Sequence, residues 1–178
     1  MTIFVGFAFF ALGAIIASFV GVIAGRYATG QSVITGRSRC DACGAPLPSL
    51  VLVPLLSYAA QVGRARCCGA RLSPLSTFAE ALLGTLFVLS YGTLGLTPAL
   101  PCFLAALAAL LAIVEYDLAH QIIPPPFLAA FLVFAIAAGT LASPSFAALL
   151  TPLVTAAVMT LFFLLLNVVS AGKLMGFS

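Results

Sequence analysis

The sequence predicts an all-α, polytopic transmembrane helix bundle with a cytoplasmic cysteine-containing loop. Hydrophobic residues make up 63% of the chain and charged residues only 6%, whereas a soluble domain carries about a quarter charged residues. The apolar residues also form runs about as long as a bilayer crossing, separated by turns that contain Gly or Pro. Such a chain covers its surface with lipid, so the lipid bilayer is its first expected partner.

Five spans are expected from the order of the apolar runs: 3–24, 75–96, 102–116, 127–141 and 147–169. No basic residue precedes the first run and Arg26 follows it, which favours a retained helix over a cleaved signal peptide. The apolar piece at 47–62 is short and broken by proline. We expect it to lie at the membrane interface or against the bundle.

The basic residues predict the orientation in the membrane. Six of the seven basic residues are arginines between positions 26 and 71. Clustered Arg next to a span marks the cytoplasmic side, so the N-terminus is expected outside. Counting crossings then places Asp117 and Lys173 on the cytoplasmic side. The arginines form no adjacent run and lie between two spans, so no nucleic-acid partner is expected.

Two cysteine motifs lie in this Arg-containing loop. "SRCDACGAPLP" contains Cys40 and Cys43, "GRARCCGARLS" contains Cys67 and Cys68, and a glycine follows each pair. Paired cysteines before glycine are typical of zinc sites, because the glycine permits a turn in which both sulfurs face one ion. A cytoplasmic location keeps thiols reduced, which favours a metal over a disulfide.

The second motif departs from this pattern. Ala65 stands where a matching cysteine would fall, and adjacent cysteines seldom reach the same tetrahedral ion without strain. Two interpretations therefore remain open. Either the four cysteines form a zinc site, or the loop has lost its metal and keeps small thiols.

The chain holds only four acidic residues, and three of them lie in or beside expected spans. Asp117 ends the third span, just before the prolines at 124–126, and an ionisable residue at membrane depth is a functional hypothesis by default. The alternative is a helix end solvated by water. Glu115 is two residues away and faces another side of the helix. Glu80 lies in the second span, as a structural partner of a loop arginine or as part of a site. His120 is interpreted as a surface residue near lipid headgroups.

The motifs occur in a specific order: "ASFVGVIAGRYATG", "SRCDACGAPL", "VPLLSY", "GRARCCGARLSPLSTFAEALLG" and "EYDLAHQIIPPPF". With this order the chain resembles the type IV prepilin peptidases. These are the bifunctional leader peptidases and N-methyltransferases of pilus and type II secretion systems. The resemblance covers nearly the whole chain.

The resemblance implies an intramembrane aspartyl protease of the bacterial inner membrane. The first of the family's two aspartates corresponds to Asp117, Glu80 matches a family glutamate, and the cysteine loop is the one expected to bind zinc. The implied substrate is a pilin-like precursor, cleaved after a glycine and then methylated with S-adenosylmethionine. The chain then divides into span one at 1–24, the cytoplasmic Cys/Arg loop at 25–73, and spans two to five of the peptidase-like domain at 74–178.

The chain also departs from the family pattern. Besides Ala65 and the shifted Cys67, Pro125 stands where Asp or Asn is common, and the tail "KLMGFS" approaches G-x-G-D without reaching the Asp. Aspartyl proteolysis needs two carboxylates that share a site. We therefore expect that the chain as written is not a competent peptidase by itself, either because it is a fragment of a longer enzyme or because it is a degenerate member.

The sequence suggests two alternatives to the peptidase. One is a catalytically inactive family member that acts as a membrane binding or assembly protein. The other is a small transporter or channel, whose spans would carry polar residues near the bilayer midplane. The first, third and fourth expected spans carry almost none there, which disfavours the transporter.

Overall fold

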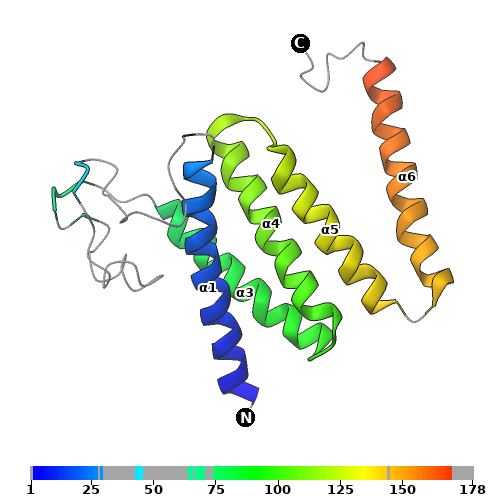
Figure 1. The fold of residues 1–178 in the computed structure, drawn as a ribbon, viewed down its shortest axis with the longest axis horizontal. Coiled ribbons are helices and arrows are strands. Elements are labelled where there is room, and N and C mark those ends of the chain that lie inside the picture. Colours follow the sequence, from blue (N-terminus) through cyan, green and yellow to red (C-terminus); the bar gives the residue numbers. More distant parts are fainter. Residues whose placement is uncertain are drawn as a thin grey trace. The chain divides into compact units, whose positions relative to one another are not determined.

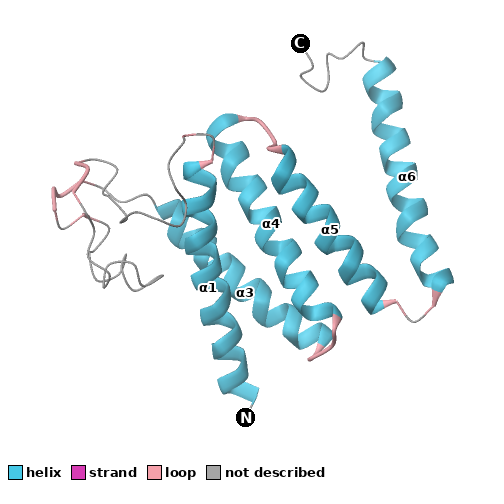
Figure 2. Cartoon of the chain, viewed as in Figure 1, coloured by secondary structure: helices cyan, strands magenta, loops and turns pink. Residues whose placement is uncertain are grey.

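The computed structural model describes residues 2–27, 29, 43–45, 64–65, 67–70, 74–143 and 145–169. Five helices make up most of this part of the chain (Figures 1 and 2): α1 Thr2–Arg26, α3 Pro74–Leu94, α4 Ala99–His120, α5 Pro125–Ala142 and α6 Phe146–Val169. Within these ranges there is no β-strand. The all-α prediction is confirmed.

Four of these helices, α1, α3, α4 and α5, are long and apolar enough to cross a membrane. The polytopic prediction is therefore confirmed. The fifth expected span, 147–169, coincides with α6, which contains the apolar stretch Leu150–Phe162. The segment at 47–62, expected at the interface, lies outside the described residues.

Helix α4 is longer than the apolar run that predicted it. It begins at Ala99, directly after Pro98, and continues to His120. Pro101 falls in the first turn, where a missing N–H breaks no helical hydrogen bond. At the other end the helix continues over polar residues until Gln121, which adopts the left-handed conformation with φ 54°. Hydropathy locates the lipid-facing part of a helix, whereas backbone capping decides where the helix ends.

The three prolines after α4 leave only a short break before the next helix. Pro124 is fully buried, and its carbonyl accepts hydrogen bonds from the N–H groups of Phe127 and Leu128 at 3.1 and 3.2 Å. Helix α5 already begins at Pro125. Proline is favoured in a first helical turn because its fixed φ suits the helix and its missing N–H would have no partner there. The break between α4 and α5 is thus confined to 121–124.

Helices α1 and α3 cross at two glycines. A Cβ added to Gly13 would lie 2.7 Å from the Cα of Gly84, and one added to Gly84 would lie 2.9 Å from the carbonyl oxygen of Phe10. Only glycine permits so close an approach of two backbones. In lipid, helices associate through such small residues, because burial of apolar surface gives no advantage over the surrounding acyl chains.

Aromatic contacts show how α1, α3 and α4 run relative to one another. The ring of Phe9, early in α1, stacks on that of Tyr91, late in α3, with centroids 4.7 Å apart. Together with the glycine crossing, this contact shows that α1 and α3 are antiparallel. At the other end of α1, Tyr27 contacts Tyr116 of α4 at 5.4 Å. The end of α1, the start of α3 and the end of α4 therefore lie at one end of this three-helix group.

The chain divides into two compact units, Met1–Ala138 and Gly139–Ser178. Every site residue that the sequence predicts falls in the first unit. The core of that unit lies between α1, α3 and α4, where Phe87 and Leu83 are its largest fully buried side chains besides Pro124.

Candidate functional site

Asp117 lies in the last turn of α4 with its side chain exposed. Its backbone carbonyl accepts a hydrogen bond of 2.7 Å from the N–H of Gln121, the left-handed residue that caps the helix. The carboxylate therefore stands on a helix end whose backbone is held by a C-cap. This is the position expected from the sequence, at the end of the third span.

An aromatic cluster formed by Tyr27, Tyr116, His120 and Phe127 lies next to Asp117 in the chain. Tyr27 contacts Tyr116 at 5.4 Å and Phe127 at 4.9 Å between ring centroids. The ring of His120 packs on Tyr116 at 4.4 Å, one helical turn away. The cluster joins the end of α1, the end of α4 and the start of α5. It therefore packs these three segments against one another.

Glu115 points away from this surface and into the bundle. Its Oε2 atom is buried and has no hydrogen-bond partner in the described part of the chain. A Cβ added to Gly21 of α1 would lie 3.5 Å from that atom. Glu80 of α3 is only 7% exposed and interacts electrostatically with Glu115. Two of the chain's four acidic residues thus meet between α1, α3 and α4.

The sequence spacing predicts Glu115 on another face of the helix than Asp117, as in the structure, but it indicates no role for this residue. A carboxylate within an apolar run was the available signal, because such groups are costly in lipid. Glu80 was considered as a partner of a loop arginine or as part of a site. The structure brings it beside Glu115, which no spacing in the sequence indicates.

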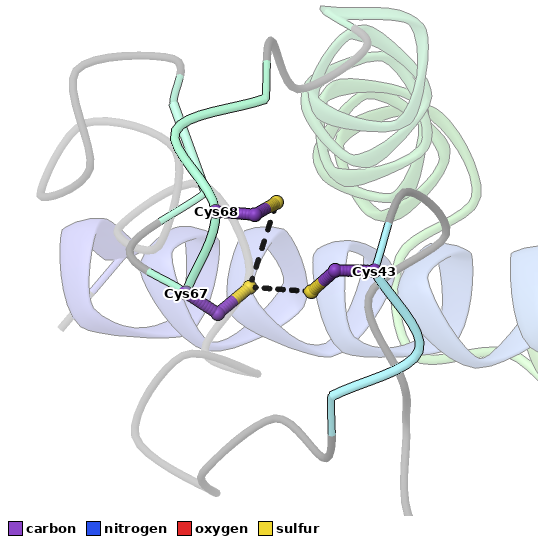
Figure 3. Close-up of side chains that lie close together, drawn as sticks. All are labelled: Cys43, Cys67 and Cys68. Carbon is purple, nitrogen blue, oxygen red and sulfur yellow. Dashed lines mark hydrogen bonds between the residues drawn. The ribbon is translucent and has the colours of Figure 1, made fainter.

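The second centre is a thiol cluster formed by Cys43, Cys67 and Cys68, whose side chains point toward one another (Figure 3). The Sγ atom of Cys67 lies 3.4 Å from that of Cys43 and 3.9 Å from that of Cys68. All three sulfurs lie within 4.8 Å of one another, and all three residues are exposed. Cys40, the fourth predicted ligand, lies outside the described residues.

The geometry of the thiol cluster suits a metal ion. Zn–S bonds of about 2.3 Å in a tetrahedral site place sulfurs about 3.8 Å apart, and the two distances from Cys67 lie on either side of this value. Gly44 and Gly69 follow their cysteines with φ of 71° and 72°, a conformation that favours glycine. Adjacent cysteines were expected to reach one ion only rarely, yet both face the same point here (Figure 3). The cluster can hold a metal ion.

The sequence of this chain is similar to those of known proteins. A family model, the Bacterial Peptidase A24 N-terminal domain, matches residues 11–94, from α1 through the cysteine loop to the end of α3. A protein from Myxococcus xanthus named prepilin leader peptidase/N-methyltransferase is 36% identical over 115 residues, which cover 65% of this chain and 34% of that protein.

Two further proteins carry the same name. The Bacillus subtilis protein is 31% identical over 135 residues, covering 76% of this chain and 54% of its own length. The Klebsiella pneumoniae protein is 34% identical over 99 residues, covering 54% and 42%. No solved structure matches the chain. The chain thus spans about half, or less, of the length of these relatives.

The matched residues include the motifs that carry chemistry. The range of this chain that the family model matches contains both cysteine pairs and Glu80, and the matches to the relatives extend beyond that range. The model's description and the names of the relatives agree with the resemblance seen in the motif order, and the helix bundle is of the kind that it implies. The family model and the three named relatives together support the type IV prepilin peptidase family for this chain.

Proposed function

We propose that this chain acts in a membrane-embedded aspartyl leader peptidase that cleaves pilin-like precursors, with Asp117 as one of the two catalytic carboxylates. The observation that carries the proposal is the exposed position of Asp117 on the capped end of α4. A carboxylate there is open to a substrate segment at the membrane interface while the rest of the helix remains in lipid. The names of the relatives support the same activity.

The reaction needs two carboxylates with different protonation. One is ionised and activates water, and the other is protonated and donates to the peptide oxygen. Glu80 is buried and interacts electrostatically with Glu115, whose Oε2 atom is also buried, so neither is suited to work with Asp117 on its exposed face. We propose that the second carboxylate comes from a G-x-G-D segment of the kind that the family resemblance implies.

The proposed location is the bacterial inner membrane, with the N-terminus outside and the cysteine loop in the cytoplasm. Arg26 ends α1, and the aromatic cluster joins that end to the last turn of α4. Asp117 therefore lies at the same end of the helix group as the first arginine of the loop. A basic cytoplasmic loop and a cytoplasmic Asp117 are thus consistent with one orientation. The proposed division remains 1–24, 25–73 and 74–178.

Two cofactors accompany this proposal. Zn²⁺ would be held by Cys43, Cys67 and Cys68, with Cys40 as the expected fourth ligand, and it would order the loop between α1 and α3. S-adenosylmethionine would supply the methyl group for N-methylation, the second activity in the relatives' name. We assign no residue to methyl transfer.

The test uses Asp117→Asn in the natural gene product, purified from its host and reconstituted with a pilin-like precursor in lipid vesicles. Asn keeps the shape of Asp but cannot ionise, so cleavage is expected to fall by about 1,000-fold or more. Leu118→Ala, at the exposed neighbouring position, is the matched control and should cleave normally. Full cleavage by the Asp117→Asn variant would show that this carboxylate is not catalytic.

A parallel assay on the 178-residue chain alone tests the expectation that it is not competent by itself. Cleavage by this chain, abolished by Asp117→Asn, would contradict that expectation. An inactive family member that binds precursors is the second candidate, because no other acidic group accompanies Asp117 on the exposed face of α4. It would give precursor binding without cleavage in both proteins.

A further inference from the structure

The second cysteine motif keeps the turn of a metal-binding loop but lacks one of its ligands. In the first motif the cysteines precede Gly44 by four and one residues. The same spacing before Gly69 places Ala65 and Cys68 at the ligand positions. Ala65 has a methyl group there and offers no donor to a metal.

The backbone around Ala65 is nevertheless ordered as a tight turn. The N–H of Gly69 donates to the carbonyl of Ala65 at 2.7 Å, and the N–H of Ala65 donates to the carbonyl of Ala70 at 2.8 Å. Ala65 is only 3% exposed, so its methyl group is covered by surrounding residues. The frame that would present sulfurs from positions 65 and 68 is therefore intact, although the first position carries no sulfur.

Cys67 supplies a sulfur at this place from two residues further along. Its Sγ atom lies between those of the other two cysteines, 3.4 Å from Cys43 and 3.9 Å from Cys68 (Figure 3). In an extended segment, neighbouring side chains point to opposite sides. Here the turn brings both members of the Cys67–Cys68 pair to one side, which the order of residues alone did not indicate.

We propose that Cys67 is a relocated metal ligand that replaces the thiolate missing at Ala65. The site then binds a thiophilic divalent ion, with Zn²⁺ as the expected occupant, through Cys43, Cys67 and Cys68. This inference rests on the metal part of the proposed function and is independent of precursor cleavage. It assigns to this chain a ligand spacing in which adjacent cysteines bind the same ion.

The test measures metal binding by the purified 178-residue chain in detergent under reducing conditions. Bound Zn²⁺ is counted by elemental analysis, and Co²⁺ is titrated as a spectroscopic substitute whose thiolate charge-transfer band reports sulfur ligands directly. The chain is expected to bind one ion. Cys67→Ala is expected to weaken the affinity by about 100-fold or more, because a thiolate ligand is lost.

The decisive variant transfers the thiol from position 67 to position 65. Cys67→Ala combined with Ala65→Cys restores the family spacing and is expected to recover the affinity to within about threefold of the original chain. This recovery also shows that Cys67→Ala alone does not act by unfolding the loop. Cys102→Ala, in α4 and away from the thiol cluster, is the matched control and should bind metal normally.

The possible results distinguish the relocation of the ligand to Cys67 from the existence of the metal site itself. No metal bound by the original chain would overturn the metal site and the relocation together. Normal binding by Cys67→Ala would overturn the relocation while leaving a metal site. Weak binding by Cys67→Ala that the double variant does not recover would also overturn it, because position 65 would then not be equivalent to position 67.

Discussion

Helices α3 and α6 are both apolar, but they differ in how they are packed. In α3, Phe87 is 0% exposed and Gly84 touches the backbone of α1. In α6, every described side chain from Leu150 onward is exposed. Hydrophobicity is therefore common to both, whereas small residues at a crossing belong to α3. The comparison teaches that apolar composition places a helix in the membrane, whereas small residues at a crossing allow it to pack closely against another helix.

The polar side chains of α3 and α6 differ in the same way as their apolar ones. In α6, the hydroxyls of Thr155 and Thr160 donate to carbonyls of their own helix at 2.9 and 2.8 Å, so they need no partner from another helix. Glu80 of α3 instead lies buried beside Glu115 of α4. An ionised carboxylate cannot donate a hydrogen bond to a carbonyl of its own helix as a threonine hydroxyl does. A carboxylate within an apolar helix therefore indicates that the helix packs against others.

The largest effect is expected from a cavity in the packed group. Phe87→Ala should lower the free energy of unfolding by about 3–5 kcal/mol, because the lost ring contacts are not replaced. Reversible unfolding in mixed micelles of dodecyl sulfate measures this change. Phe7→Ala, on the part of α1 where the ring is 72% exposed, should cost less than about 1 kcal/mol. Equal costs at the two positions would mean that α3 is no better packed than an exposed helix face.

An intermediate effect is expected at the glycine crossing. Gly84→Ala should destabilise by about 1–3 kcal/mol, because the new methyl group meets the backbone of Phe10 and the helices must separate. Gly139→Ala is the control, since nothing lies within 4 Å of its added Cβ. There Ala should be neutral or stabilising, because it favours helix over Gly. The same unfolding measurement checks both, and a neutral Gly84→Ala would show that α1 and α3 do not depend on this contact.

The smallest effect is expected in α6. Leu161→Ala should change the free energy of unfolding by less than about 0.5 kcal/mol, because the side chain is exposed within its unit. A loss comparable to that of Phe87→Ala, measured in the same micelles, would instead reveal a packing partner for α6 and remove the contrast between the two helices.

Much of the chain's organisation could be predicted from local patterns. Apolar run length predicts a membrane protein and the approximate spans, and it requires no knowledge of what each helix contacts. The ends of α4 were predicted less well, because Pro98 and Gln121 set them through backbone conformation rather than through hydropathy. The position of Asp117 at the end of its span was read correctly, since the polar residues around it follow the apolar run directly.

By itself, the sequence determined that this protein is an all-α membrane bundle, that its arginines and four of its five cysteines lie between its first two apolar runs, and that Asp117 follows the end of another such run. These properties depend on residues close together in the chain. Only the tertiary structure decided that Glu80 interacts with Glu115, whose carboxylate lies near Gly21 of α1, and that Cys67 turns its sulfur toward Cys43. Both arrangements join distant segments, and each depends on backbone geometry that residue spacing does not encode: a close helix approach in one case and a tight turn in the other.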